Sequence, residues 1–154
     1  MRLLLMRHGE AGFDAPSDFD RVLTPRGRVS IGSLINANIE LFQQVEVVVH
    51  SPYVRAQQTA QLVMGSAGHD IEPVVSGDFT PDSDLTAAMA ALEAYQDCSS
   101  LLLVTHQPLI GRLASLLIEG DARYPEPMAP GDVLAIDFEI VVAGCGLLQK
   151  RLIA

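Results

Sequence analysis

The sequence has few cysteines, few lysines and no tryptophan, and these shortages exclude several classes of protein. Its two cysteines, Cys98 and Cys145, are too few for a disulfide framework, and neither stands in a CxxC or CxxH pattern. No apolar run approaches the ~20 residues that a membrane-spanning helix requires. These absences predict a soluble protein of a reducing compartment, located in the cytoplasm and without a membrane partner.

Positive charge is also scarce. Ten basic residues stand against 19 acidic ones, and the formal net charge of −9 disfavours nucleic acids and anionic membranes, because both bind broad positive surfaces. A small anionic group needs only a local cluster of positive charge, and every basic residue except Lys150 is an arginine. The planar arginine side chain binds phosphate or carboxylate through two parallel hydrogen bonds. The positions of the arginines are therefore the first guide to function.

Apolar residues are plentiful enough for one packed core. They make up 49% of the 154 residues, which is typical of a globular protein, and we expect residues 1–154 to form a single domain. Short apolar runs typical of strands occupy residues 2–7, 45–50, 71–75, 100–105, 132–139 and 147–153. Longer stretches with helical spacing occupy residues 25–44, 52–64, 83–96 and 108–119. This alternation predicts an α/β fold, a three-layer α/β/α sandwich with a mainly parallel central sheet.

Proline and glycine mark the boundaries of two predicted helices. Thr24 and Ser51 each precede a proline, which places a capping side chain before a residue suited to the first helical turn. Gly65 and Gly68 are expected to end the helix that follows Ser51.

Charged side chains follow the predicted parallel strands. Arg7 and His8 end the first strand, and Arg55 lies in the first turn of the helix after the second. His106 directly follows the strand at residues 100–105. Ligands of parallel α/β sheets bind beyond the carboxyl ends of the strands, so we expect these four side chains to meet at one edge of the sheet.

Two arginines and two histidines can build a phosphoryl-transfer site. Arg7 and Arg55 can clamp a tetrahedral dianion from two sides. The helices predicted to begin at Pro52 and Pro108 add free backbone N–H groups. A neutral imidazole is a nucleophile for phosphorus, and a second, cationic imidazole stabilises charge on the transferring group. This set needs no cofactor, and neither histidine has a second ligand at metal-binding spacing, so no metal is expected. The residues alone do not assign the two roles.

Three sequence blocks resemble the motifs of one known family. Residues 5–11 (LMRHGEA) resemble the RHG signature of the histidine phosphatase superfamily, which includes the phosphoglycerate mutase-like proteins. Residues 51–59 (SPYVRAQQT) resemble its SPxxRAxQT block, and residues 105–109 (THQPL) resemble its (S/T)HxP block. The blocks stand in the family's order, with matching strands and helices around them. Within the family, the chain is most similar to the short SixA-type phosphohistidine phosphatases.

The resemblance assigns roles to the four residues. It implies that His8 is the nucleophile and becomes transiently phosphorylated. It also implies that Arg7, Arg55 and His106 complete the phosphate pocket, and that water then hydrolyses the phosphohistidine intermediate.

Four further polar residues near the motifs are candidates for the site. Ser51 and Gln107 can donate hydrogen bonds to phosphate, although capping and packing roles suit their positions equally well. Asp78 is the candidate proton donor, because ester-hydrolysing relatives usually carry a carboxylic acid after the third strand. Glu10 follows the RHG signature and can orient an arginine.

The spacing between the second and third blocks bears on the substrate. Only 50 residues separate Arg55 from His106, which leaves no insertion large enough to form a cap domain over the site. An open site suits a phosphoryl group presented by another protein better than a small sugar phosphate. When phosphohistidine reacts, its side chain can leave as neutral imidazole, whose conjugate acid has a pKa of about 6.5. We therefore expect a monomeric phosphatase that acts on a histidine phosphotransfer domain of a signalling protein.

Two other functions remain open from the sequence. One is a phosphomonoesterase acting on a small metabolite, and the other is a non-catalytic phosphate-binding module. A phosphoacceptor receiver domain shares the α/β pattern but needs an acidic pair after the first strand, where this chain has Arg7 and His8.

Overall fold

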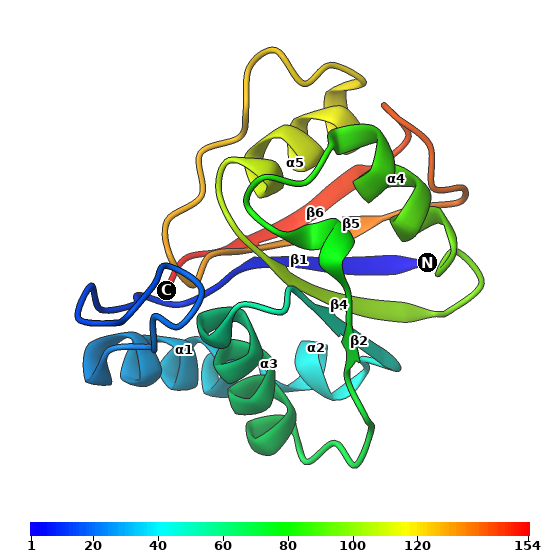
Figure 1. Cartoon of the computed structure of the whole chain (residues 1–154). Helices are drawn as coiled ribbons and strands as arrows, with labels where there is room; N and C mark the ends of the chain where they lie inside the picture. The colour runs from blue at the N-terminus through cyan, green and yellow to red at the C-terminus, as the bar shows by residue number, and fades with distance from the viewer.

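The computed structural model describes residues 1–154 and contains a six-stranded sheet between two layers of helices (Figure 1). The strands lie in the order β3-β2-β4-β1-β5-β6. Their bounds are β1 (Arg2–Arg7), β2 (Val47–His50), β3 (Val74–Val75), β4 (Ser100–Thr105), β5 (Val133–Asp137) and β6 (Leu147–Leu152). The first four strands pair in parallel, and β5 and β6 add two antiparallel pairings. The predicted three-layer α/β sandwich with a mainly parallel sheet is confirmed.

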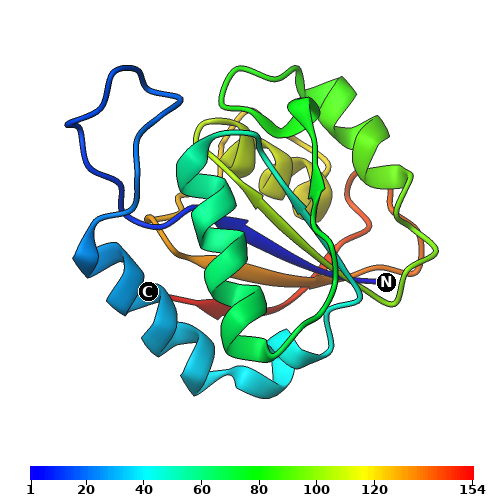
Figure 2. The same cartoon turned by 60° about the horizontal axis from the view of Figure 1, so that its bottom comes forward.

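Helices cover both faces of this sheet. Their bounds are α1 (Pro25–Ala37), α2 (Ile39–Gln43), α3 (Val54–Ala67), α4 (Leu85–Glu93) and α5 (Leu109–Glu119), with a short 3-10 helix at Gly77–Phe79. Helices α1, α2 and α3 lie against one face, and α4 and α5 lie against the other (Figures 1 and 2). None of these helices is both long enough and apolar enough to cross a membrane.

The central strand β1 separates the two halves of the core. Leu3 and Leu5 pack among residues of α4 and α5, whereas Leu4 and Met6 pack among residues of α1, α2 and α3. All four side chains are fully buried. Successive side chains of a strand point to opposite faces, so this alternation also determines which layer each residue after Met6 faces.

Helix α1 begins as predicted and ends earlier than predicted. The Thr24 hydroxyl accepts a hydrogen bond from the N–H group of Gly27 at 2.9 Å, and Pro25 stands in the first turn. The helix expected over residues 25–44 is interrupted at Asn38, where a φ of −134° leaves the helical region. Two helices, α1 and α2, therefore replace the single predicted one.

Helix α3 is displaced toward the C-terminus relative to the prediction. Tyr53 is extended, with φ −65° and ψ 137°, so the helix begins at Val54 instead of at residue 52. Ser51 does not cap the helix; its hydroxyl makes only a 3.5 Å contact with the Tyr53 N–H group. Gly65 lies inside the helix, and Gly68 ends it with the left-handed φ of 74° that glycine adopts most easily.

Two other elements are shorter than the sequence indicated. β3 contains two exposed residues instead of the five predicted over 71–75, because it is an edge strand paired only with β2. α4 begins at Leu85 because the Asp84 carboxylate accepts hydrogen bonds from the first-turn N–H groups of Thr86 and Ala87.

A long loop connects β1 to α1 and projects beyond the carboxyl ends of the parallel strands. We call residues 8–24 the β1–α1 loop; it is the dark blue segment away from the sheet in Figure 2. The base of the loop is closed by an antiparallel bridge between Ala11 and Leu23 and by a 2.9 Å hydrogen bond from Gly12 N–H to the Val22 carbonyl. This closure brings the rest of the loop toward the start of α3.

Candidate active site

The two histidines of the motif blocks meet at the carboxyl ends of β1 and β4. The His8 N–H group donates to the Thr105 carbonyl at 3.0 Å, so the pairing of the two strands continues one residue beyond β1. Side chains alternate between the two faces of β1 and β4, so those of His8 and His106 lie on the face that α1, α2 and α3 cover. Their ring centroids lie 4.8 Å apart, and both residues are buried, with exposed fractions of 7% and 1%.

The hydrogen bonds of His8 define which ring nitrogen can attack. Nδ1 lies 2.7 Å from the Gly9 carbonyl oxygen, which can only accept, so Nδ1 carries the proton. Nε2 then has a free lone pair and accepts a hydrogen bond from Nε of Arg55 at 3.1 Å. Nε2 is therefore the ring nitrogen whose lone pair is available.

Burial keeps both imidazoles neutral. It lowers the pKa of His8 to about 4, against the opposing effect of the hydrogen bond to Gly9, and the nearby Arg55 and Arg7 lower it further. Burial, with contributions from His8 and Arg55, lowers the pKa of His106 to about 2. The sequence predicted a second histidine that stays cationic longer inside an anion site; in the phosphate-free protein burial lowers the pKa of His106, and the nearby Asp18 carboxylate opposes this effect without overcoming it.

His106 is held by rings rather than by hydrogen bonds. Its centroid lies 4.9 Å from that of Tyr53 in an edge-on arrangement, and neither of its buried ring nitrogens has a hydrogen-bond partner. A buried imidazole without partners is costly unless a ligand supplies them. The arrangement therefore suits a ligand that offers polar oxygens to this ring.

Arg55 comes from the first turn of α3 and is 4% exposed. Its Nη1 donates to the main-chain carbonyl of Asp18 at 2.5 Å, and its Nη2 donates to the Asp18 carboxylate at 3.0 Å. The guanidinium carbon also lies 4.8 Å from the centroid of the Tyr53 ring. These contacts, together with the bond from Nε to His8, fix the guanidinium beside Nε2 of His8.

Arg7 approaches from the other layer, as expected for the residue that precedes His8 in the strand. Its Nη1 donates to the Met128 carbonyl at 2.7 Å, whereas its buried Nε has no partner. Burial lowers the pKa of Arg7, an effect that Asp132 opposes and Arg55 increases. Arg7 therefore keeps donor capacity for an anion in the site.

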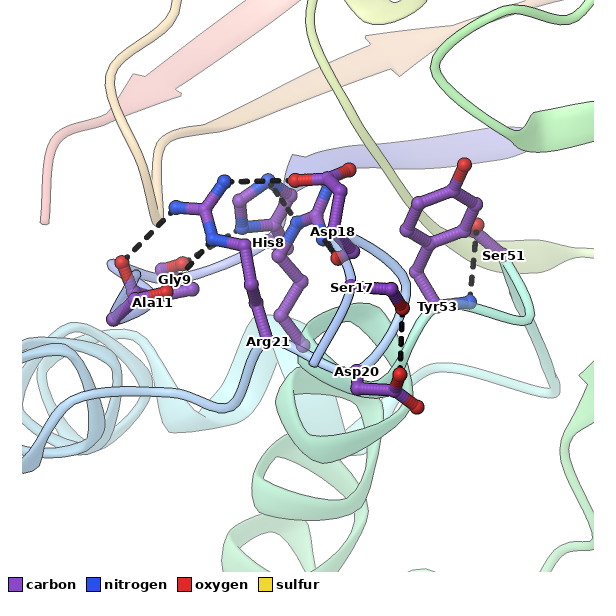
Figure 3. Close-up of polar contacts among 11 residues, drawn as sticks. His8, Gly9, Ala11, Ser17, Asp18, Asp20, Arg21, Ser51 and Tyr53 are labelled. Atoms are coloured by element: carbon purple, nitrogen blue, oxygen red, sulfur yellow. Dashed lines mark hydrogen bonds and ion pairs between the residues drawn. The ribbon is translucent and has the colours of Figure 1, made fainter. Parts of the chain in front are cut away.

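Asp18 is a member of the site that sequence reasoning missed. Its carboxylate bridges Arg55 and Arg21, with a distance of 2.9 Å from Arg21 Nη1 to its second oxygen. Figure 3 shows Asp18 and Arg21 side by side, next to the ring of His8. Hydrogen bonds from Arg21 and then from Arg55 lower the pKa of Asp18, so its carboxylate is ionised. No motif signals this role, because only the fold of the β1–α1 loop brings Asp18 to Arg55.

Arg21 is tied to the backbone of the same loop. Its Nε donates to the Gly12 carbonyl at 2.7 Å, its Nη2 donates to the Ala11 carbonyl at 3.2 Å, and its guanidinium carbon lies 4.2 Å from the centroid of the exposed Phe13 ring. Arg21 therefore holds the backbone of the β1–α1 loop and the Asp18 carboxylate in place in this structure.

Three of the four motif residues, Arg7, His8 and Arg55, line a cavity of about 390 Å³ at this edge of the sheet. His106 is not among the lining residues; it is buried next to the His8 ring. Residues from both layers and from the β1–α1 loop line the cavity: Arg7, His8, Glu10, Ala11, Phe13, Asp18, Arg21, Arg55, Pro81, Gln107 and Pro130. Three of these lining residues, Arg7, Arg21 and Arg55, are arginines, so the cavity has the chemistry that suits an anion.

Two of the four remaining candidate residues, Gln107 and Glu10, line the cavity. Gln107 lines the cavity, although its amide nitrogen donates to the Glu126 carbonyl at 3.2 Å. Glu10 also lines it, accepts from the Thr24 hydroxyl at 2.8 Å and lies 3.9 Å from Arg26.

Ser51 and Asp78 are not among the lining residues. Ser51 is fully buried, and its hydroxyl contacts only the N–H group of Tyr53. Asp78 is exposed, and its carboxylate accepts from the Ser76 hydroxyl at 3.0 Å. The structure therefore does not bring the predicted proton donor to the cavity.

The start of α3 presents fewer free N–H groups than predicted. The Val54 N–H group donates to the Phe19 carbonyl of the β1–α1 loop at 3.1 Å, and the N–H groups of Ala56 and Gln57 donate to the Tyr53 carbonyl. The Phe19 carbonyl of the loop therefore binds one N–H group that was expected to bind an anion. For metals, the structure contains no group of three or more histidine, cysteine, aspartate or glutamate side chains placed to hold an ion.

Comparison with known sequences gives consistent matches. The model of the histidine phosphatase superfamily (branch 1) matches residues 3–78. Phosphohistidine phosphatase SixA of Escherichia coli (strain K12) is 35% identical over 125 residues, which cover 79% of this chain and 76% of that protein. A phosphohistidine phosphatase SixA homolog of Haemophilus influenzae is 30% identical over 126 residues, which cover 76% of this chain and 77% of that protein.

Solved structures match over almost the whole chain. The protein histidine phosphatase SixA complexed with tungstate superposes with a TM-score of 0.88 at 28% identity, covering 99% of this chain and 96% of that chain. A mycobacterial glucosyl-3-phosphoglycerate phosphatase superposes with a TM-score of 0.74 at 15% identity, covering 96% of both chains. The second likeness concerns the fold alone.

Proposed function

This chain belongs to the histidine phosphatase superfamily and is a phosphatase, and from that premise we propose that it removes the phosphoryl group from phosphohistidine on a protein. The reaction passes through a covalent phosphohistidine on His8. The observation that carries this proposal is the pair of contacts on the His8 ring: the Gly9 carbonyl holds the proton on Nδ1, and Nε2 faces Arg55 across 3.1 Å.

In the first step, the lone pair of His8 Nε2 attacks phosphorus. A bond from Nε2 to phosphorus forms as the bond from phosphorus to the substrate nitrogen breaks, and the electron pair of that bond stays on the substrate imidazole. Arg7 and Arg55 neutralise the phosphoryl oxygens, and His106 contacts them with the ring nitrogens that have no partner in the free protein. A phosphoryl dianion raises the pKa of a neighbouring imidazole, so His106 gains a proton more easily once the substrate is bound.

In the second step, water attacks the phosphorylated His8. The bond from phosphorus to Nε2 breaks, inorganic phosphate leaves, and the ring returns to its neutral state. The Gly9 carbonyl keeps the proton on Nδ1 throughout, so the same nitrogen is available for the next cycle.

The acid–base character of the cavity supports phosphohistidine over a phosphate ester. An ester releases an alkoxide and needs a proton donor, whereas phosphohistidine with a protonated second nitrogen leaves as neutral imidazole. Of the two lining carboxylates, Asp18 is held ionised by arginines, and Glu10 accepts a hydrogen bond from Thr24. Asp78 stays our weaker candidate for a donor, because it lies outside the lining residues.

A protein substrate also fits the surroundings of the site. We propose that residues 1–154 act as a single domain without a cap insertion; the segment between Arg55 and His106 contains the rest of α3, β3, the short 3-10 helix, α4 and β4. The partner we propose is a histidine phosphotransfer domain, in line with the similarity to phosphohistidine phosphatase SixA. A cytoplasmic location, a monomeric state and binding of phosphate by Ser51 and Gln107 stay predictions.

The experiment that tests the proposal is a substrate panel. We would measure kcat/KM on a phosphohistidine phosphotransfer domain and on several sugar phosphates, with the unaltered protein and with His8→Asn. The matched control is His69→Asn, because Nε2 of His69 bonds to the Phe42 carbonyl and the residue lies outside the cavity. We expect the phosphoprotein to be the better substrate, and only His8→Asn to remove turnover.

A labelling experiment tests the intermediate. Brief mixing with a radiolabelled phosphohistidine protein, followed by denaturation, should leave an acid-labile label on the unaltered protein and on His69→Asn. Faster turnover of sugar phosphates would replace the proposed substrate with a small metabolite. Phosphate binding without turnover or label would instead indicate a non-catalytic binding module.

A further inference from the structure

Every nitrogen of the Arg55 guanidinium already has a partner in this structure. Nε donates to His8 Nε2 at 3.1 Å, Nη1 donates to the Asp18 carbonyl at 2.5 Å, and Nη2 donates to the Asp18 carboxylate at 3.0 Å. Three of the five N–H groups of the guanidinium are therefore occupied, and only one on each terminal nitrogen is left for phosphate. A phosphoryl group can bind the side of the guanidinium that faces Asp18 only if it replaces the contacts that Asp18 makes.

Asp18 occupies Arg55 as an anionic ligand would. A carbonyl oxygen accepts from Nη1 and a carboxylate oxygen accepts from Nη2, and phosphate also binds a guanidinium through two such parallel bonds. The Asp18 side chain is 57% exposed, whereas the Arg55 side chain is 4% exposed. The carboxylate is thus the part of the pair that can move into solvent, and the buried guanidinium is the part that stays.

The rest of the β1–α1 loop allows that movement without loss of its anchor. Arg21 holds the Gly12 and Ala11 carbonyls, so it can keep Asp18 beside the cavity after Asp18 has left Arg55. The Phe19 carbonyl, which accepts from Val54 N–H, attaches the loop to α3 independently of Arg55. The exchange therefore requires a local displacement near residue 18 rather than unfolding of the loop.

We propose that Asp18 is an internal anion that exchanges with the phosphoryl group on Arg55 in each catalytic cycle. Asp18 binds the Arg55 guanidinium in the free protein, and the phosphoryl group of the substrate displaces it. After hydrolysis Asp18 binds the guanidinium again and displaces inorganic phosphate. Asp18 is a positioning residue that acts through Arg55, and the inference rests on the proposed function of Arg55 as a phosphate ligand. Its consequence is weak binding of the product and weak product inhibition.

The test measures inorganic phosphate binding by titration calorimetry and product inhibition by phosphate in the turnover assay. Asp18→Asn removes the charge that competes for Arg55, and Asp18→Ala removes the whole side chain. The matched control is Asp14→Asn, because Asp14 is an exposed residue of the same loop whose carboxylate has no hydrogen bond or ion pair in the structure. Thermal unfolding of each variant checks that the protein is folded.

We expect phosphate to bind both Asp18 variants about tenfold more tightly than the unaltered protein, the effect of removing one competing hydrogen bond to a charged group. The inhibition constant for phosphate should fall by the same factor. Asp14→Asn should change both quantities by less than about twofold, which separates exchange at Arg55 from the general loss of one negative charge.

Three results would overturn the inference. Weaker phosphate binding in the folded Asp18 variants would mean that Asp18 only orients Arg55, and equal effects of Asp18→Asn and Asp14→Asn would mean that charge alone matters. Absence of phosphate binding in every variant would remove the exchange as well. The turnover of the phosphohistidine protein is read separately, so a failure of the proposed function shows as lost turnover in the unaltered protein.

Discussion

The Nε–H group of Arg55 donates to Nε2 of His8 across 3.1 Å. This contact requires His8 to be neutral, because an arginine is always protonated and a protonated Nε2 would present a second donor to it. The same guanidinium therefore helps to select the protonation state that the proposed nucleophile needs. Binding of a phosphoryl group converts this contact into one in which both residues face the same anion.

The pH dependence of turnover should reflect the lowered pKa of His8. With a pKa of about 4 in the folded protein, His8 is neutral over the whole range above pH 5. We expect the loss of kcat/KM that an ordinary histidine would produce near pH 6.5 to be absent, and the acid limb to appear near pH 4. Short assays with quenching limit acid hydrolysis of the substrate. An acid limb centred near pH 6.5 would contradict the burial effect.

Stability should also depend on the protonation of His8. Between pH 6.5 and 4, an unfolded histidine binds a proton that the buried His8 does not bind, so the free energy of unfolding decreases as the pH falls. This difference in proton binding at His8 makes the free energy of unfolding about 3 kcal/mol smaller at pH 4 than at pH 7. Urea unfolding at pH 7, 5.5 and 4 should show a smaller decrease for His8→Asn. Parallel curves for the two proteins would refute this.

Replacement of His8 should remove turnover and leave the fold intact. His8→Ala deletes the attacking nitrogen, and we expect at least a thousandfold loss of kcat, the size seen when a covalent nucleophile is removed. Circular dichroism and thermal unfolding should show a folded protein, because the core strands do not depend on the imidazole. Substantial residual activity would mean that another residue is the nucleophile.

Replacement of Arg55 should weaken both phosphate binding and rate. Arg55→Ala removes a buried guanidinium that contacts the nucleophile, and we expect kcat to fall by roughly a hundredfold to a thousandfold. Arg55→Lys should restore little, because an ammonium group cannot reproduce the paired geometry. Arg28→Ala is the control, since Arg28 is an exposed residue of α1 outside the cavity. An unchanged rate for Arg55→Ala would exclude it from the site.

Gly27 tests the contact between α1 and the segment that follows His8. A Cβ atom on Gly27 would overlap the main-chain oxygen of Glu10, which is backbone and cannot rotate away. We expect Gly27→Ala to lower the free energy of unfolding by roughly 1–3 kcal/mol and to lower kcat/KM by displacing the RHG segment. Gly32→Ala, in the same helix and with open space around its Cβ position, should instead be neutral or stabilising. Equal effects on stability would contradict the close approach.

The sequence predicted the fold and the meeting of four side chains for a clear physical reason. Buried parallel strands have short apolar runs, and the residues after such runs must emerge at one edge of the sheet. His8, Arg55 and His106 lie where this rule puts them. The exact helix limits were less accessible, because Asn38 and Tyr53 adopt backbone conformations that their side chains do not signal.

The sequence could not predict the roles of isolated aspartates. Asp18 and Asp78 both stand in polar loops with neighbouring aspartates, and nothing in composition separates them. The fold of the β1–α1 loop brings Asp18 to Arg55, whereas Asp78 bonds to Ser76 outside the cavity. The neutrality of His106 was equally inaccessible, because it depends on how much water the surrounding rings exclude.

The alternation of side chains along β1 links folding fidelity to chemistry. Arg7 and His8 are consecutive, and they reach the cavity from opposite layers because Leu3 and Leu5 belong to one half of the core while Leu4 and Met6 belong to the other. A slip of one residue against β4 would exchange the faces of every side chain in the strand. A misregistered molecule would thus lose its packing and its nucleophile together, so partly active misfolded forms of this protein should be rare.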